Sequence, residues 1–498
     1  MPAPQPAASA ESQAYPRRWL ALFVLLLASL MNLIDVTIVN VALPRLQESL
    51  DATSTEIEWV VAAYVLAFAL GLLPFGRLGD TIGRKSMFQA GVVLFTLFSA
   101  ACGLAPTMQT LILARVFQGL AGAMMMPQVL AIAQVMFPPR ERGVAFSLFG
   151  LTAGLASVAG PLTGGLLIGA DIHGLDWRPI FLVNIPFGVG TVVAAAILVP
   201  HTPANPALRH DIGGILLAAL TVFLLVFPLI EGHSLGWPLW TFAMLGLSAV
   251  SAFAFHKHEA RRARASLSQL LPVSLLHNGS FLLGMTMVTV FFSGVAGFFI
   301  VLAVFLQTGF GLSPLESGLT TVPFPIGVLL ASIASGRFAG RWPRARIAGG
   351  AGALILGMVI LFFVVAAVGE AVDHWQFVLP LLVCGFGLGT AISSLFQTVL
   401  AHVPPQDAGS GSGAMQSFQQ IGGAIGIAIT GQIFFSSLAM RLGTGVAANE
   451  AYVDSFGNAL VFEIAAFAAV ILLLFFLKPA QDQGAHGSRS QPHTMAKA

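Results

Sequence analysis

Long apolar stretches alternate with short polar segments along most of the chain. A helix rises about 1.5 Å per residue, so roughly 20 apolar residues cross the ~30 Å hydrocarbon core of a bilayer. Fourteen stretches meet this requirement, at residues 19–43, 57–78, 86–104, 108–136, 144–168, 179–199, 212–232, 238–256, 280–304, 316–336, 347–368, 376–399, 412–437 and 455–477. Each is predicted to be a transmembrane helix.

The apolar stretches lack the pattern of membrane β-strands. Strands of a membrane barrel alternate apolar and polar residues over about ten positions, and residues 20–30 do not alternate. Hydrophobic residues make up 56% of the chain and charged residues 9%, against about 25% charged in a soluble domain. The expected fold class is therefore all-α integral membrane, solvated mainly by the lipid bilayer.

Charge and cysteine usage exclude several classes of function. The formal net charge of +2 gives no reason to expect a nucleic-acid partner. Cys102 and Cys384 both lie within apolar stretches, so no disulfide framework is expected.

Lysine and arginine indicate the orientation of the spans. Of 23 such residues, 19 fall on the side that holds both termini, three on the other side, and Arg115 lies within a span. Because cytoplasmic loops carry the excess of basic residues, we predict that both termini are cytoplasmic and that the protein is multi-pass in the cytoplasmic (inner) membrane.

A weak internal repeat divides the chain. The loop after span 2 begins at residues 76–80 (GRLGD) and the loop after span 10 at 336–340 (GRFAG), and both are basic. Two six-helix bundles, spans 1–6 and 9–14, with two inserted central helices follow from this repeat. The predicted segments are a disordered cytoplasmic tail (1–18), an N-terminal bundle (19–200), two linker helices (201–265), a C-terminal bundle (266–478) and a cytoplasmic tail (479–498).

Three charged residues lie deep within predicted spans: Asp35, Arg115 and Glu463. Each costs about 3 kcal/mol on insertion scales and is a functional candidate by default. An acid at this depth can be loaded with a proton and release it as its surroundings change. Asp35 is therefore a candidate for proton coupling, although a purely structural pair with Arg115 is the alternative. Glu463 is either a second proton or cation site or a helix–helix hydrogen-bonding group.

Span 5 is rich in glycine. Gly150 and Gly154, then Gly160 and Gly164, form two pairs of small residues four apart, which let another helix approach closely. Pro161 favours a kink in the same helix.

The chain resembles the fourteen-spanner drug–proton antiporter family of the major facilitator superfamily. Residues 76–85 (GRLGDTIGRK) are similar to the superfamily's loop 2–3 signature, and residues 111–123, which include Arg115, to its span 4 signature. The run 154–165 (GLASVAGPLTGG) resembles the antiporter signature of span 5. Further similarity lies at residues 33–44 (LIDVTIVNVALP), 177–186 (WRPIFLVNIP) and 307–318 (QTGFGLSPLESG).

The resemblance implies roles for individual residues. Asp80 and Arg84, within the loop signature Gly76, Asp80, Gly83, Arg84 and Lys85, belong to a charge network that steadies the outward-facing state. Arg115 is implicated in proton handling and Asp35 in coupling or cation recognition. A hinge is expected at the antiporter signature, whose residues are Gly154, Gly160, Pro161, Gly164 and Gly165.

The function expected is proton-coupled antiport of hydrophobic or cationic drugs by alternating access. Export of one endogenous metabolite or siderophore on the same fold is the alternative, and the need for a periplasmic adaptor stays open. No catalytic cluster or nucleotide-binding domain is recognised, so we expect no enzyme activity and no cofactor, with the proton gradient as energy source. His256, His258 and Glu259 lack metal-ligand spacing and are expected on a solvated face.

Overall fold

A computed structural model describes residues 15–202, 204, 211–337, 342–367 and 372–477. Within these residues the secondary structure is entirely helical, and fourteen helical segments are long and apolar enough to cross a membrane. The predicted all-α class and the number of spans are therefore confirmed. The predicted tail 479–498, residues 1–14 and most of the second-half loop at 336–340 lie outside the described residues.

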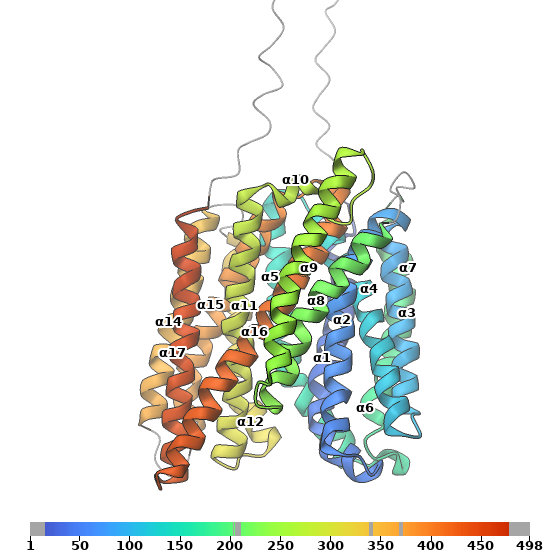
Figure 1. Ribbon diagram of the computed structural model, residues 1–498. Helices are drawn as coiled ribbons and strands as arrows, with labels where there is room; N and C mark the ends of the chain where they lie inside the picture. The colour runs from blue at the N-terminus through green and yellow to red at the C-terminus, as the bar shows by residue number, and fades with distance from the viewer. Residues whose placement is uncertain (1–14, 203, 205–210, 338–341, 368–371, 478–498) are drawn as a thin grey trace, which may run out of the picture.

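The first group of helices forms a bundle on one side of the molecule (Figure 1). Its members are α1 (Arg18–Ser49), α2 (Ser54–Ile82), α3 (Arg84–Gly103), α4 (Met108–Met136), α5 (Pro139–Gly169), a short turn at Ile172–Gly174, α6 (Pro179–Leu182) and α7 (Asn184–Leu198). Span 6 is made of α6 and α7 together. We call this group the N-terminal bundle.

The last group forms the C-terminal bundle on the other side (Figure 1). Its members are α10 (Val273–Leu276), α11 (Gly279–Val304), which runs into a π-helical turn at Phe305–Gly309, α12 (Pro314–Thr321), α13 (Pro323–Arg337), α14 (Pro343–Ala366), α15 (His374–Leu400), a 3₁₀ turn at Pro405–Asp407, α16 (Ala408–Gly443) and α17 (Ala448–Leu474). The arrangement of two bundles expected from the sequence is confirmed, while the domain boundaries at residues 200, 265 and 478 stay predictions.

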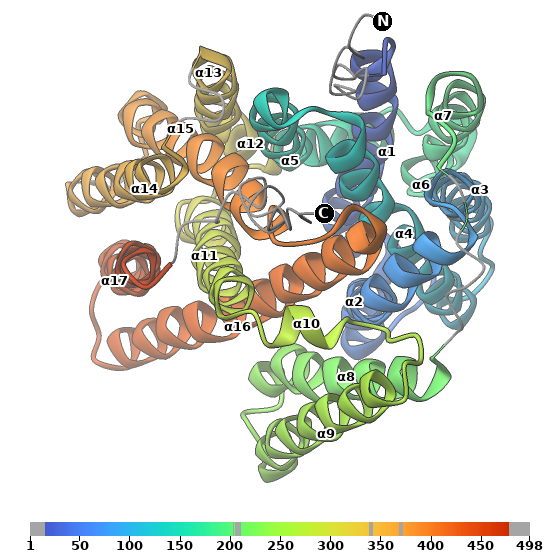
Figure 2. The same ribbon diagram turned by 90° about the horizontal axis from the view of Figure 1, so that it is seen from above.

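A hairpin of α8 (Ile212–Ser234) and α9 (Leu239–Arg264) lies on the outside of the molecule, beside α2 and α16, as Figure 2 shows from above. Helix α8 packs against both α2 and α16, one helix from each bundle. Near the turn between α8 and α9, the ring centres of Trp59 of α2 and Phe227 of α8 lie 6.1 Å apart. In the turn itself, the Trp237 indole donates to Gln432 Oε1 of α16 at 3.0 Å. The hairpin thus bridges the bundles along one face.

Local sequence signals set the helix ends. Thr53 with Glu56 forms a capping box at the start of α2, and Ser313 with Glu316 forms another at α12. Gly83 adopts φ +102°, which allows α2 to end and α3 to begin with no intervening loop.

One end of the helix array gathers most of the basic side chains, and we call it the basic end. It contains the start of α1, where Tyr15 donates to the Leu198 carbonyl at 3.1 Å and Arg18 pairs with Glu141 at 2.6 Å. The chain is therefore anchored from Tyr15 onward, earlier than the predicted tail boundary at residue 18. Its described basic residues are Arg17, Arg18, Arg77, Arg84, Lys85, Arg140, Arg142, Lys257, Arg261, Arg262, Arg264, Arg337, Arg344 and Arg346.

Candidate functional site

Asp35 and Arg115 form a wholly buried ion pair inside the N-terminal bundle. Asp35 lies near the middle of α1 and Arg115 in the first half of α4, and both side chains have an exposed fraction of 0%. Arg115 Nη1 donates to Asp35 Oδ2 at 2.5 Å. The structure therefore joins two of the three charged residues that the sequence places deep within spans.

Two amides complete the surroundings of the Asp35 carboxylate. Gln118 Nε2 and Asn184 Nδ2 both donate to Asp35 Oδ1, at 2.8 and 2.9 Å. Gln118 lies three residues after Arg115, so both project from the same face of α4, and Gln118 Oε1 accepts from Arg115 Nη1 at 2.8 Å. Asn184 also donates to Ser99 Oγ at 2.9 Å. This network ties α1 to α4, α7 and α3.

Arg115 makes further contacts with α2. Its Nε donates to the Val60 carbonyl at 3.1 Å, and its guanidinium carbon lies 4.1 Å from the centre of the Tyr64 ring. The Tyr64 hydroxyl in turn accepts from Asn32 Nδ2 at 2.5 Å. Arg115 Nη2 is buried and finds no acceptor among the described residues. The Arg115 guanidinium thus contacts α1, α2 and a neighbouring residue of α4, and its Nη2 is the nitrogen left without an acceptor in the described part of the chain.

Sequence reasoning missed the polar partners of this pair. Gln118 and Asn184 each lie inside a quoted motif, at 111–123 and 177–186, but received no role. An amide side chain within an apolar span is the sequence signal that could have identified them, because buried amides need hydrogen-bond partners.

Glu463 does not join this cluster. It lies on α17 in the C-terminal bundle with an exposed fraction of 0%, and neither carboxylate oxygen accepts a hydrogen bond from the described residues. Its titratable neighbour is Cys384 of α15. The third charged candidate is therefore isolated from Asp35 and Arg115.

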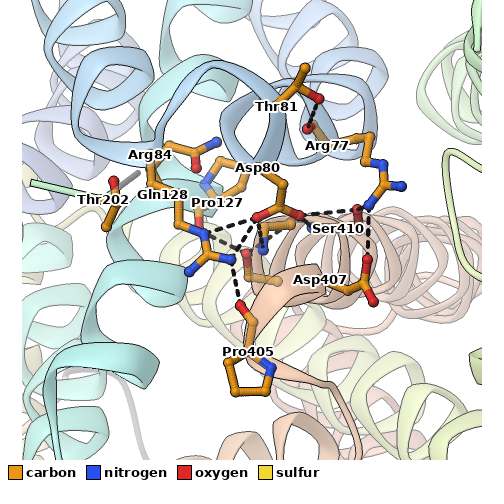
Figure 3. Close-up of polar contacts among 12 residues, drawn as sticks. Arg77, Asp80, Thr81, Arg84, Pro127, Gln128, Thr202, Pro405, Asp407 and Ser410 are labelled. Carbon is orange, nitrogen blue, oxygen red and sulfur yellow. Dashed lines mark hydrogen bonds and ion pairs between the residues drawn. The ribbon is translucent and has the colours of Figure 1, made fainter. Parts of the chain in front are cut away.

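Asp80 joins the two bundles at the basic end (Figure 3). Its carboxylate accepts from the backbone N–H groups of Gly409 and Ser410, each at 2.9 Å, at the start of α16. A helix N-terminus favours negative charge because its first N–H groups are unpaired and its dipole is positive there. Arg84 Nε donates to Asp80 Oδ1 at 2.9 Å, which completes the contact.

Other members of the loop signature divide into two sets. Arg84 Nη2 also donates to the Pro405 carbonyl at 2.6 Å, and Arg77 pairs with Asp407 at 2.9 Å, so both arginines reach the C-terminal bundle (Figure 3). Gly76 lies against Gly409, where a Cβ would strike the backbone. Lys85 instead donates to the Ala196 carbonyl of α7 at 2.9 Å, and Gly83 shapes the α2–α3 junction within the N-terminal bundle.

Direct contacts between the bundles continue around the basic end. Gln134 Nε2 of α4 donates to the Leu400 carbonyl at 2.8 Å, and Ser412 Oγ of α16 donates to the Pro127 carbonyl at 2.7 Å. Ser332 Oγ of α13 donates to the Ser147 carbonyl of α5 at 3.2 Å. We call these contacts, together with those of Arg77, Asp80 and Arg84, the basic-end gate, which is closed in this conformation.

The glycines of α5 pack on two different partners. Gly160 and Gly164 face Thr37 and Ile38 of α1, inside the N-terminal bundle, whereas Gly154 faces Pro325 of α13 in the C-terminal bundle. A Cβ on Gly165 would meet nothing within 4 Å.

Pro161 lies within α5 without dividing it. Thr37 Oγ1 donates to the Ala156 carbonyl at 3.1 Å and fixes the α1–α5 contact. Gly154, Gly160 and Gly164 are therefore packing positions in this conformation, and the hinge role of the antiporter signature stays a prediction.

Comparison with known proteins identifies the family. The model of the Major Facilitator Superfamily matches residues 25–427. The "Probable actinorhodin transporter" of Streptomyces coelicolor is 39% identical over 425 residues, which cover 85% of this chain and 74% of that protein. The "Puromycin resistance protein pur8" of Streptomyces alboniger is 32% identical over 493 residues, covering 97% and 95%.

Structural comparison agrees on the fold. The crystal structure of the human organic anion transporter MFSD10 (TETRAN) superposes with a TM-score of 0.66 at 14% identity, covering 92% of this chain and 100% of that chain. Together with the fourteen spans, these matches show that the chain is a multi-pass membrane protein of the Major Facilitator Superfamily, of the fourteen-spanner drug–proton antiporter type.

Proposed function

We propose that this protein is a secondary exporter that expels small hydrophobic or cationic compounds in exchange for protons by alternating access. One observation carries the proposal: Asp35 is completely buried within a membrane span, yet its carboxylate is held by Arg115, Gln118 and Asn184. Intramembrane acids with such partners mark proton and ion pathways. The similar proteins named for actinorhodin transport and puromycin resistance support an export role.

The distribution of basic residues supports an orientation. If the basic end is cytoplasmic, as the positive-inside rule favours, both termini are cytoplasmic in the inner membrane. The basic-end gate then closes the cytoplasmic side of the carrier. This conformation corresponds to the outward-facing half of an alternating-access cycle, in which Asp80 rests on the start of α16.

Protonation of Asp35 is the proposed coupling step. The ionised carboxylate holds α1 to α4 and α7 through its three donors. A proton on Asp35 removes the negative charge and leaves Arg115 as an uncompensated buried cation, which costs several kcal/mol. A rearrangement of α1 against α4 relieves that cost, so proton binding is linked to movement of the helices.

Competition at Asp35 provides the exchange. A proton and a cationic compound both neutralise the same carboxylate, so occupancy by one excludes the other. Glu463 is a candidate for a secondary proton site, because a buried carboxyl group without a donor favours its neutral form. Protons and the expelled compound suffice for this exchange, and an adaptor is needed only where a second membrane encloses the cell.

Export of a single endogenous product is the second candidate. It is favoured by the 39% identity with a protein named as a transporter of one compound, actinorhodin. Growth assays of expressing cells against a panel of dyes and antibiotics separate the two candidates. A broad resistance profile supports multidrug export, and resistance to one chemical class supports a dedicated exporter.

Proton release from proteoliposomes tests the mechanism. Purified protein is reconstituted with a pH-sensitive dye and an imposed pH gradient, and compounds from the panel are added singly. We expect substrate to move against its own gradient while protons move in the opposite direction, and this uphill movement should stop when an ionophore collapses the pH gradient. Uphill substrate movement that persists at full rate after the collapse would contradict proton coupling.

A further inference from the structure

The hairpin of α8 and α9 contains a buried polar cluster that the transport mechanism does not use. Asp211 directly precedes α8, and His258 and Glu259 lie in the last turns of α9, all at the basic end. The sequence predicts a solvated face for His258 and Glu259, and this prediction is wrong for Glu259, whose exposed fraction is 0%. The sequence analysis did not include Asp211, which is a neighbour of both residues but lies 47 residues before His258 in the chain.

Asp211 is already surrounded by donors. Its Oδ1 accepts from the Gly214 backbone N–H at 2.9 Å and lies 2.9 Å from His258 Nε2. Its Oδ2 lies 3.0 Å from Arg262 Nε. Asp211 therefore has a donor or a basic side chain beside each of its carboxylate oxygens.

Glu259 is the unexplained member of the cluster. Both of its carboxylate oxygens are buried, and no Lys, Arg or His side chain of the described residues donates to them; the groups beside this carboxylate are the Leu270 backbone and the Asp211 carboxyl. Gly214 lets both acids come close to its backbone, because a Cβ there would lie 2.5 Å from Glu259 Oε1 and 2.6 Å from Asp211 Oδ2. Two carboxyl groups this close in a buried site need a proton or a metal cation between them.

One ligand atom from each of Asp211, His258 and Glu259 lies within 4.8 Å of the other two. A tetrahedral zinc ion with bonds of about 2.0–2.2 Å separates its ligand atoms by roughly 3.3–3.6 Å, so side-chain movements of about 1 Å bring the three ligand atoms to this spacing. Two carboxylates with one imidazole suit a first-row transition metal, since magnesium and calcium prefer oxygen ligands alone.

We propose that Asp211, His258 and Glu259 bind one divalent transition-metal cation at the basic end of the α8–α9 hairpin. The ion takes the place of the proton on His258 Nε2 and puts a positive charge beside the Glu259 carboxylate. Arg262 stays beside Asp211 and does not bind the ion. It fastens the start of α8 to the end of α9. Because α8 packs on α2 and α16, the ion stiffens the element that bridges the two bundles.

Zinc binding to the purified full-length protein tests the proposal. The protein is stripped with a chelator, dialysed against Zn²⁺ in millimolar Mg²⁺, and assayed for bound metal. We expect one zinc ion per chain, and at least about tenfold weaker binding in Glu259→Gln and in His258→Gln. His256→Gln is the matched control on the same helix and should bind as the unsubstituted protein does.

The alternative occupant is a proton shared by Asp211 and Glu259. In that case the unsubstituted protein takes up no stoichiometric zinc and its thermal unfolding is unchanged by the metal, which overturns the proposal. Equal zinc affinity in both cluster variants also overturns it. If Glu259→Gln does not assemble, His258→Gln decides the question, because the His258 side chain is 31% exposed and tolerates substitution.

Discussion

In the N-terminal bundle, the Asp35 carboxylate on α1 receives hydrogen bonds from Arg115, Gln118 and Asn184. In the C-terminal bundle, Glu463 on α17 is equally buried but receives no hydrogen bond from the described residues. Breaking a paired buried charge costs far more than altering a neutral buried group. The two acids should therefore respond very differently to loss of their ability to ionise.

The helix packing of the two bundles is alike, although their buried acids differ. Gly160 of α5 lies against Thr37 of α1, and Gly426 of α16 lies against Ser293 of α11 in the corresponding position of the other bundle. Each bundle thus has a glycine-lined contact between its first and fifth spans. The two bundles share this helix packing but differ in their buried acids, as expected if the coupling site proposed above lies in the N-terminal bundle.

The largest expected effect is that of Asp35→Asn. The amide keeps the shape of the side chain but cannot exchange a proton, so proton-driven efflux should fall to the background of empty liposomes. Transport of an uncharged substrate down its own gradient should persist, because only a cationic compound competes for the carboxylate, and this is measured in the same vesicles without a pH gradient.

Glu48→Gln is the control for this prediction. Glu48 lies on the same helix, its side chain is 72% exposed, and its only recorded ion pair is with Arg45 at 3.6 Å, so its contribution is small. Retained pH-dependent efflux in Asp35→Asn would place the coupling group elsewhere and break the comparison between the bundles.

Next in size are the glycine contacts, which should matter equally in both bundles. Gly160→Ala and Gly426→Ala each insert a methyl group against atoms that cannot move freely, Thr37 in one case and the Ser293 carbonyl in the other. Overpacking of this kind costs about 1–3 kcal/mol, so we expect roughly tenfold slower turnover for each.

Gly169→Ala at the end of α5 serves as the matched control, because a Cβ there meets nothing within 4 Å and Gly169 lies outside the antiporter signature. Turnover is measured at saturating substrate on protein that elutes as a single species. If Gly426→Ala leaves turnover unchanged while Gly160→Ala slows it, the packing of the two bundles is not equivalent after all.

The sequence predicted the spans and the deep charges because both depend on composition alone. Asp35 and Arg115 are charged residues within apolar stretches, which is visible without any tertiary structure. The partners of Asp80 could not be predicted in this way, since Gly409 and Ser410 follow it by more than 300 residues and act through backbone N–H groups that every residue carries. Likewise, the acid that lies beside Glu259 is Asp211, which directly precedes α8 and is far from Glu259 in the sequence.

Asp80→Asn should have a moderate effect that shows whether an acid of the N-terminal bundle also controls the gate. The amide loses the charge that favours the start of α16, which is typically worth up to about 1 kcal/mol. We expect the basic-end gate to open more often, by roughly fivefold. The measurement is the rate at which an impermeant maleimide labels Ser412→Cys, a position buried at the gate.

Thr81→Ala is the control for the gate experiment, because Thr81 Oγ1 donates only to the Arg77 carbonyl of its own helix. Labelling should be as slow in this variant as in Ser412→Cys alone. Equal labelling rates in Asp80→Asn and Thr81→Ala would show that the charge of Asp80 does not hold the gate.

The smallest expected effect belongs to Glu463→Gln. A carboxyl group buried without a donor is least costly when neutral, and an amide of the same shape replaces it with little change, so transport should alter by no more than about twofold. The number of protons moved per substrate should stay the same. The double variant Asp35→Asn, Glu463→Gln should behave as Asp35→Asn does. A fall in proton stoichiometry in Glu463→Gln alone would instead make Glu463 a second coupling site, and the C-terminal bundle would then bind a proton without the ion pair that its counterpart requires.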